Sequence, residues 1–105
     1  MTKADLYTEE QIASGLKELD GWEVKNERLR KQFTFKTFLR SLSFVNSVGY
    51  LAEGAGHHPD ITINYNKVTL RLVTHSEGGL TWRDFDLAKQ IDEKLASKLI
   101  LAPEE

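Results

Sequence analysis

Residues 60–73, DITINYNKVTLRLV, carry the clearest structural pattern in the chain. Apolar residues occupy every second position on both sides of a polar turn: Ile61, Ile63 and Tyr65 before Asn66-Lys67, then Val68, Leu70 and Leu72, which alternate with Thr69, Arg71 and Val73. A period of two is typical of strands with one buried face. The stretch therefore predicts a β-hairpin with one face turned to the core.

The segment upstream of this hairpin shows the same period. It runs over Trp22–Val24 and Arg28–Phe35, with the turn Lys25-Asn26-Glu27 between the two parts. One face of the longer part consists of Leu29, Lys31, Phe33 and Phe35. We therefore expect a second hairpin.

Three helical segments flank the hairpins. Thr8 and Gln11 form a capping-box pattern that opens a helix over about 9–19, and Thr37 opens a second that ends at Gly54-Ala55-Gly56. Thr81 and Asp84 open a third that runs to about Leu101, ahead of Pro103. The order α-β-β-α-β-β-α predicts an α+β fold, a four-stranded antiparallel sheet with three helices on one face.

Length and composition limit the class of protein. A chain of 105 residues, 40% hydrophobic and 29% charged, predicts one globular domain over residues 1–105. The net charge of −2, without a basic run, argues against a nucleic-acid partner. The absence of cysteine excludes disulfides and a thiolate nucleophile. Because the charged start and the lack of a long apolar run argue against export and membrane insertion, we expect a cytoplasmic protein.

The second helix has more apolar surface than one sheet can cover. Its apolar residues spread over about half of the helix circumference at 100° per residue: Phe38, Leu42, Phe44, Val45, Val48, Leu51 and Ala52. Arg40 is the only charged residue between Phe38 and Ala52. We therefore expect this helix to contact other subunits in a homo-oligomer.

All three histidines of the chain lie within nineteen residues, His57-His58 before Pro59, and His75 just past a predicted strand. Imidazoles titrate near neutrality, so several at one place can both remove and deliver a proton. Pro59 favours an extended His58, and strand alternation predicts that His75 projects away from the core. Glu53 and Asp84 could orient the imidazoles by hydrogen bonds, without contacting the substrate themselves.

Other interpretations of these residues remain open. A histidine pair before a proline also occurs in solvated loops, and three imidazoles can form an open zinc site, although adjacent side chains in extended backbone point apart. Gly78-Gly79 could present N–H groups to an anion but fits a turn better. Trp22, Trp82 and Tyr65 could line a flat pocket, although core packing is the default for each.

Several short stretches together resemble the pterin-4a-carbinolamine dehydratases, and with the first hairpin the resemblance covers about residues 8–100. They are AEGAGHHPD (52–60), YNKV (65–68), Thr74-His75, Gly79-Leu80-Thr81 and Asp84. The resemblance implies the fold predicted above, and dehydration of 4a-hydroxytetrahydrobiopterin to quinonoid dihydropterin, without metal or cofactor. This step recycles the pterin after aromatic amino acid hydroxylation.

The resemblance also implies roles for individual residues. His57 and His75 would be the acid/base pair, in an order that the sequence does not assign, and His58 would chiefly bind the pterin. The backbone around Gly56 and the stretch Val73, Thr74, His75 and Ser76 would contact the hydrogen-bonding edge of the substrate. Glu53, Pro59 and Asp84 would support the histidines.

One position departs from the family pattern, since Gly56 stands where the animal members have Asp. A possible carboxylate partner of the imidazoles is therefore missing. Some relatives have lost the histidines and act as assembly or binding proteins, and animal members also serve as transcriptional coactivators. A non-catalytic binding or coactivator protein on the same fold is thus the alternative. The resemblance implies a homodimer joined through sheet edges, or a homotetramer in which the second helices form a bundle.

Overall fold

The computed structural model describes residues 5–96. Its elements are α1 (Glu9–Lys17), β1 (Glu23–Lys25), β2 (Arg28–Thr34), α2 (Phe38–Ala55), β3 (Asp60–Asn64), β4 (Lys67–Leu72), a 3-10 turn η1 (His75–Glu77), α3 (Trp82–Gln90) and a π-helical turn η2 (Ile91–Ala96). The N-caps of the three α-helices are Thr8, Thr37 and Thr81, as predicted. The order of helices and strands is also the predicted one.

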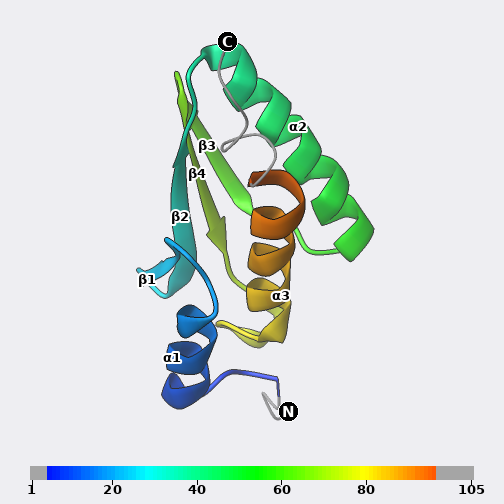
Figure 1. The fold of residues 1–105 in the computed structure, drawn as a ribbon. Coiled ribbons are helices and arrows are strands. Elements are labelled where there is room, and N and C mark those ends of the chain that lie inside the picture. The colour runs from blue at the N-terminus through cyan, green and yellow to red at the C-terminus, as the bar shows by residue number, and fades with distance from the viewer. Residues whose placement is uncertain (1–4, 97–105) are drawn as a thin grey trace.

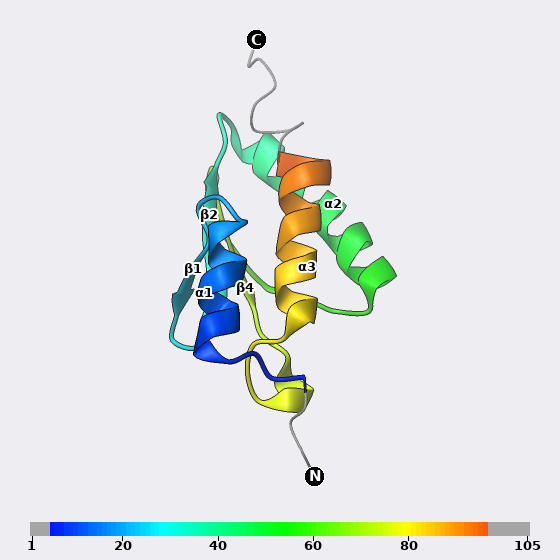
Figure 2. The same ribbon diagram turned by 60° about the horizontal axis from the view of Figure 1, so that its bottom comes forward.

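The four strands form one antiparallel sheet in the order β1-β2-β4-β3. Each hairpin pairs its own strands, and β2 and β4 join the two hairpins at the centre. The long helix α2 and the helix α3 lie along the same side of the sheet, and α1 lies at one end (Figures 1 and 2). Apolar side chains of α1 pack against the same core, so the predicted fold is confirmed.

The core lies between the sheet and the helices. Its fully buried large side chains come from both central strands, from α2 and α3, and from η2: Leu29, Phe33, Phe44, Val48, Val68, Leu70, Leu72, Leu87 and Ile91. Lys31 shares the core-facing side of β2, and its Nζ lies 3.1 Å from Asp92 Oδ1 and 2.6 Å from the Asp20 carbonyl. These partners explain how a lysine is accommodated in an otherwise apolar row.

The structure differs from the predicted elements in several places. β1 is Glu23–Lys25 instead of the predicted Trp22–Val24, and α1 ends at Lys17 instead of at about residue 19. The second hairpin turns at Tyr65 and Asn66, one residue before the predicted turn at Asn66-Lys67. Tyr65 has φ 56° in this turn and is exposed, so it does not belong to the apolar row. Ile61 and Ile63 remain 37% exposed because β3 is an edge strand. The third helix changes to η2 after Gln90, and its predicted end near Leu101 lies outside the described residues.

The second helix keeps a large part of its apolar surface in solvent. Phe44, Val48 and Ala52 are buried against the sheet, whereas Leu39 is 72% and Tyr50 81% exposed. Phe38 and Leu42 are also exposed. Across residues 5–96, no helix combines the length and apolar character required to cross a bilayer.

Candidate active site

The end of α2 positions the histidine pair. Gly56 adopts the left-handed conformation, with φ 64° and ψ 29°. Its N–H donates to the Glu53 carbonyl, and the N–H of His57 donates to the Ala52 carbonyl at 3.1 Å. These two bonds form a Schellman motif, which turns the chain sharply at the end of a helix. The motif therefore fixes the backbone from which His57 projects.

A compact turn after β4 positions the third histidine. The Thr74 N–H donates to the Gly79 carbonyl, and the Thr74 carbonyl accepts from Glu77 and Gly78. Gly78 has φ 77°, which glycine adopts readily, and it closes the turn. His75 begins this turn and is exposed, as predicted. Gly78 and Gly79 thus have the turn role that the sequence favoured.

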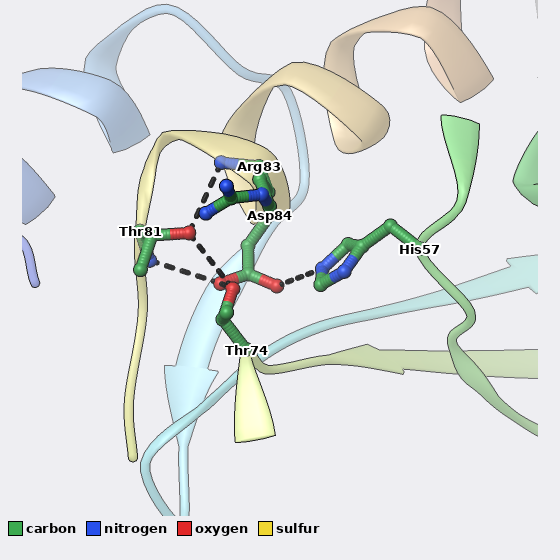
Figure 3. A network of polar contacts seen from close by, with 5 residues as sticks. All are labelled: His57, Thr74, Thr81, Arg83 and Asp84. Carbon is green, nitrogen blue, oxygen red and sulfur yellow. Dashed lines mark hydrogen bonds and ion pairs between the residues drawn. The ribbon is translucent and has the colours of Figure 1, made fainter. Parts of the chain in front are cut away.

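A buried carboxylate joins the two segments (Figure 3). Asp84 in the first turn of α3 has 0% exposure, and its Oδ1 lies 2.6 Å from His57 Nε2. Its Oδ2 accepts from the Thr74 hydroxyl at 2.9 Å and from the Thr81 N–H at 3.0 Å. The Thr74 and Thr81 hydroxyls are themselves 2.8 Å apart. Asp84 therefore caps α3 and orients His57 at the same time.

His58 has a much more open environment. Its Nε2 lies 2.6 Å from Glu53 Oε1, on the last turns of α2, but both side chains are largely exposed. A contact of this kind in water contributes little free energy. His57 is the better fixed of the two, because its side chain is 12% exposed and bonded to a buried carboxylate.

One open cleft of about 370 Å³ gathers the predicted substrate-binding residues. Its lining consists of Gly56, His57, His58, Val73, Thr74, His75, Ser76 and Arg83. The first seven are those named from the sequence. The volume lies within the range of about 300–1,000 Å³ that is common for small-molecule sites.

Arg83 also lines the cleft and was missed in the sequence analysis. Its guanidinium carbon lies 5.0 Å from the centre of the Trp82 ring, and its Nη1 lies 3.5 Å from Asp5 Oδ2. The position of Arg83, next to the capping residue Asp84, was the available signal. A cation at the rim adds a donor for electron-rich atoms of a ligand.

Other predicted residues lie away from the cleft lining. Pro59 follows the histidine pair without lining the cleft. Trp22 is buried, and its Nε1 donates to Asp92 Oδ2 at 2.9 Å. Tyr65 lies in the β3–β4 turn, and Trp82 is half exposed under Arg83. The three aromatic residues thus do not form a common pocket.

A larger hollow of about 530 Å³ lies between α1 and α3. Its walls include Tyr7, Glu18 and Phe85, and no histidine borders it. Size alone would favour this hollow, but the convergence of titratable side chains favours the smaller cleft. We therefore place the candidate active site at the histidine cleft.

The donor groups do not have the arrangement of a metal site. Within residues 5–96, no group of three or more His, Cys, Asp or Glu side chains converges in a way that could hold a metal ion. The interpretation of the three histidines as zinc ligands therefore has no support in their geometry.

The bond to Asp84 determines which nitrogen of His57 can exchange protons. A carboxylate only accepts hydrogen bonds, so the hydrogen in the 2.6 Å contact belongs to His57 Nε2. In the neutral ring, the lone pair then resides on Nδ1. His57 is thus equipped to accept a proton at Nδ1 and to return it from the same atom.

Known proteins resemble this chain in sequence, and solved structures resemble it in fold. The family described as Pterin 4 alpha carbinolamine dehydratase matches residues 5–94. A Roseiflexus castenholzii protein is 50% identical over 86% of this chain and 97% of its own length. A Sulfolobus acidocaldarius protein is 46% identical over 81% and 93%. Both carry the provisional name pterin-4-alpha-carbinolamine dehydratase.

Two solved structures show the same architecture. A Brucella melitensis protein described as a transcriptional coactivator/pterin dehydratase is 34% identical with a TM-score of 0.79, over 83% of this chain and 95% of that one. A pterin dehydratase-like protein identified as a RuBisCO assembly factor in the alpha-carboxysome is 22% identical with a TM-score of 0.59, over 70% and 87%. At that identity, the second likeness concerns the fold alone.

Proposed function

The chain belongs to the pterin 4 alpha carbinolamine dehydratase family, and from this premise we propose that it dehydrates 4a-hydroxytetrahydropterin to quinonoid dihydropterin and water. The reaction would return the pterin to use after aromatic amino acid hydroxylation. The family membership supplies the reaction class, and the histidine cleft supplies the groups that could perform it.

The reaction requires two proton transfers on neighbouring atoms. The N–H bond of the ring nitrogen next to C4a breaks, and its electron pair forms the new double bond to C4a. The bond from C4a to oxygen breaks, and the departing hydroxyl receives a proton to leave as water. A base and an acid placed on either side of C4a therefore suffice.

We assign these two tasks to His57 and His75. His57 exchanges its proton at Nδ1, because Asp84 holds Nε2. His75 lines the same cleft from the turn after β4. His58 and the backbone at Gly56 and Val73–Ser76 bind and position the pterin. The observation that carries the proposal is the bond of His57 to the buried Asp84, in a cleft that also contains the other two histidines.

The first prediction concerns the activity itself. Freshly generated carbinolamine is mixed with the protein, and its loss is followed by ultraviolet absorbance. We expect turnover well above the buffer rate, and replacement of both His57 and His75 by Ala should lower kcat by about 10²–10⁴-fold, the usual contribution of such proton transfer. A folded wild-type protein that does not exceed the buffer rate would refute the proposed function.

His58 provides the comparison within the same cleft. His58→Ala should chiefly raise KM, because we assign its exposed side chain to substrate binding and not to proton transfer. A lower kcat at unchanged KM would instead place His58 in the chemical step.

The alternative function is a binding or assembly role on the same fold. The exposed apolar surface of α2 favours protein contacts, and one protein of the same fold is identified as a RuBisCO assembly factor. The carbinolamine assay separates the two functions, since only the enzyme consumes substrate. We also propose that the protein acts as a homo-oligomer, a tetramer or a dimer.

A further inference from the structure

A positively charged groove crosses the face of the sheet that carries no helices. It has a volume of about 220 Å³ and is lined by Lys25, Asn26, Arg28, Arg30 and Arg71. Four of these five residues are cationic. The groove is formed by side chains of three adjacent strands and the β1–β2 turn.

Two of its arginines are placed unfavourably for the stability of the sheet. Arg30 of β2 and Arg71 of β4 are directly opposite each other in the antiparallel register. Like charges at such positions destabilise a sheet. A local arrangement that opposes stability is a mark of a functional site.

Nearby carboxylates neutralise only one of the cations. Arg30 Nη1 lies 2.7 Å from Glu23 Oε2. Arg71 is opposite Asp60 in register, but it donates to the Thr62 hydroxyl and forms no ion pair among the described residues. Within residues 5–96, Lys25 and Arg28 likewise have no carboxylate within ion-pair distance. The groove thus retains unpaired positive charge.

The groove is continuous with the histidine cleft. A hollow of about 270 Å³ lies between them, lined by Asn26, Glu27, Arg28, Val73, His75 and Gly78. It shares Val73 and His75 with the cleft, and Asn26 and Arg28 with the charged groove. Val73 and Arg71 are two residues apart on β4 and its extension, which is about 7 Å along a strand.

We propose that the charged groove binds an anionic group, a phosphate ester or a carboxylate, on the side chain of the pterin whose ring occupies the histidine cleft. The inference rests on the proposed function, because it assigns the ring to that cleft. Arginine guanidinium groups bind both kinds of oxyanion through paired N–H donors. The ring would have its hydrogen-bonding edge near Gly56 and its substituted carbon toward His75, so in this orientation the Val73–Ser76 stretch lies nearer the substituted end than the resemblance implied.

The surroundings of the groove fit a single small anion better than a polymer. Glu23, Glu27 and Asp60 border the cations, and the chain as a whole has a net charge of −2. An extended polyanion would meet these carboxylates beyond the groove. A short substituent that reaches from the cleft would pass Glu27 in the connecting hollow and end among the four cations of the groove.

The test compares two dihydropterins that differ only in a phosphate on the side chain. Calorimetry at low salt should show that the wild-type protein binds the phosphorylated compound about tenfold more tightly, as expected for charge-assisted hydrogen bonds at an exposed site. Arg71→Gln should lower this ratio severalfold, and Lys25 and Arg28 should retain the remainder. Lys17→Gln makes the same change of charge on α1, away from the groove, and should keep the ratio near ten. The same measurement is made with a third dihydropterin, which carries a carboxylate in place of the phosphate.

Three results would overturn the inference. They are equal wild-type affinity for the neutral compound and both anionic compounds, an unchanged ratio in Arg71→Gln, and displacement of the phosphorylated compound by a short oligonucleotide. Thermal unfolding checks the fold of the variant, and its midpoint should rise, because the repulsion with Arg30 is removed. Wild-type turnover of the neutral carbinolamine tests the proposed function separately. A failure of the proposed function can therefore be distinguished from a failure of the anion-site inference.

Discussion

Asp84 is the residue on which the orientation of His57 depends. It accepts from three donors, the Thr74 hydroxyl, the Thr81 N–H and His57 Nε2. Among the described residues, no buried side-chain nitrogen or oxygen lacks a partner, so this network is complete. A complete buried network holds its members rigidly. The network therefore holds the imidazole in one orientation, with Nε2 as the donor to Asp84.

The second prediction replaces this carboxylate by its isosteric amide. In Asp84→Asn, the amide oxygen is needed by Thr74 and Thr81, so the amide NH₂ faces His57 and donates to Nε2. The ring must then carry its hydrogen on Nδ1, so the lone pair that the proposed proton exchange uses at that atom is lost. We expect kcat to fall by about 10–100-fold, the usual effect of losing such a partner, with a smaller change in KM.

Asp86→Asn is the matched control. Asp86 lies on the same helix, is exposed and accepts from Gln90 at 2.7 Å. Its variant should keep wild-type kinetics. Nitrogen NMR of the imidazoles would report the tautomer directly, and an unchanged His57 tautomer in Asp84→Asn would contradict the mechanism.

The sequence indicated both the position of these residues and Glu53 and Asp84 as partners of the imidazoles, but not which carboxylate contacts which histidine. The histidine clustering, the family motifs and the strand end identified seven of the eight residues that line the cleft. The contact of Asp84 with His57 was harder to foresee, because a carboxylate three residues after Thr81 is already explained as a cap. Burial and pairing across 27 residues depend on how α3 packs beside the end of α2.

At the scale of elements, the end of α2 links the fold to the site. The turn at Gly56 directs the chain from the helix into the histidine pair and then into β3. A Cβ at Gly56 or Gly54 would meet nothing within 4 Å, so space is not the constraint at either position. Of these two glycines, only Gly56 has a positive φ, of 64°.

The third prediction uses this pair of glycines. Gly56→Ala should lower the free energy of unfolding by about 1–2 kcal/mol, because a Cβ is unfavourable in the left-handed conformation. Gly54→Ala, within α2, should raise it by about 0.5–1 kcal/mol, because alanine favours a helix. Urea unfolding measures both. A similar effect of the two substitutions would show that conformation at Gly56 does not control stability.

The elements themselves were largely predictable, since period and capping are local signals. The errors occur where a longer-range feature decides the outcome. Tyr65 entered the turn because the paired register of β3 and β4 begins at Asn64 and Lys67. Ile61 and Ile63 stayed partly exposed because the strand order places β3 at the edge of the sheet. The apolar alternation within each hairpin does not determine the order of the strands in the sheet.

At the scale of the whole molecule, much apolar surface remains uncovered. On α2, Phe38, Leu39, Leu42 and Tyr50 are exposed. Exposed apolar patches of this kind mark contact surfaces. The edge strand β3 adds unpaired backbone groups that could join a second sheet.

The last prediction concerns assembly through these two surfaces. We expect a tetramer in which the β3 edges form dimers and the α2 helices join the dimers, because each surface needs a separate partner. Leu39→Glu places a charge on the exposed side of α2, so it should split the tetramer into dimers without unfolding the subunit.

Light scattering coupled to size-exclusion chromatography gives the mass. Ala13→Glu, at an exposed position of α1, should leave the mass unchanged. A wild-type monomer at micromolar concentration would refute the assembly, and wild-type mass in Leu39→Glu would exclude α2 as the contact.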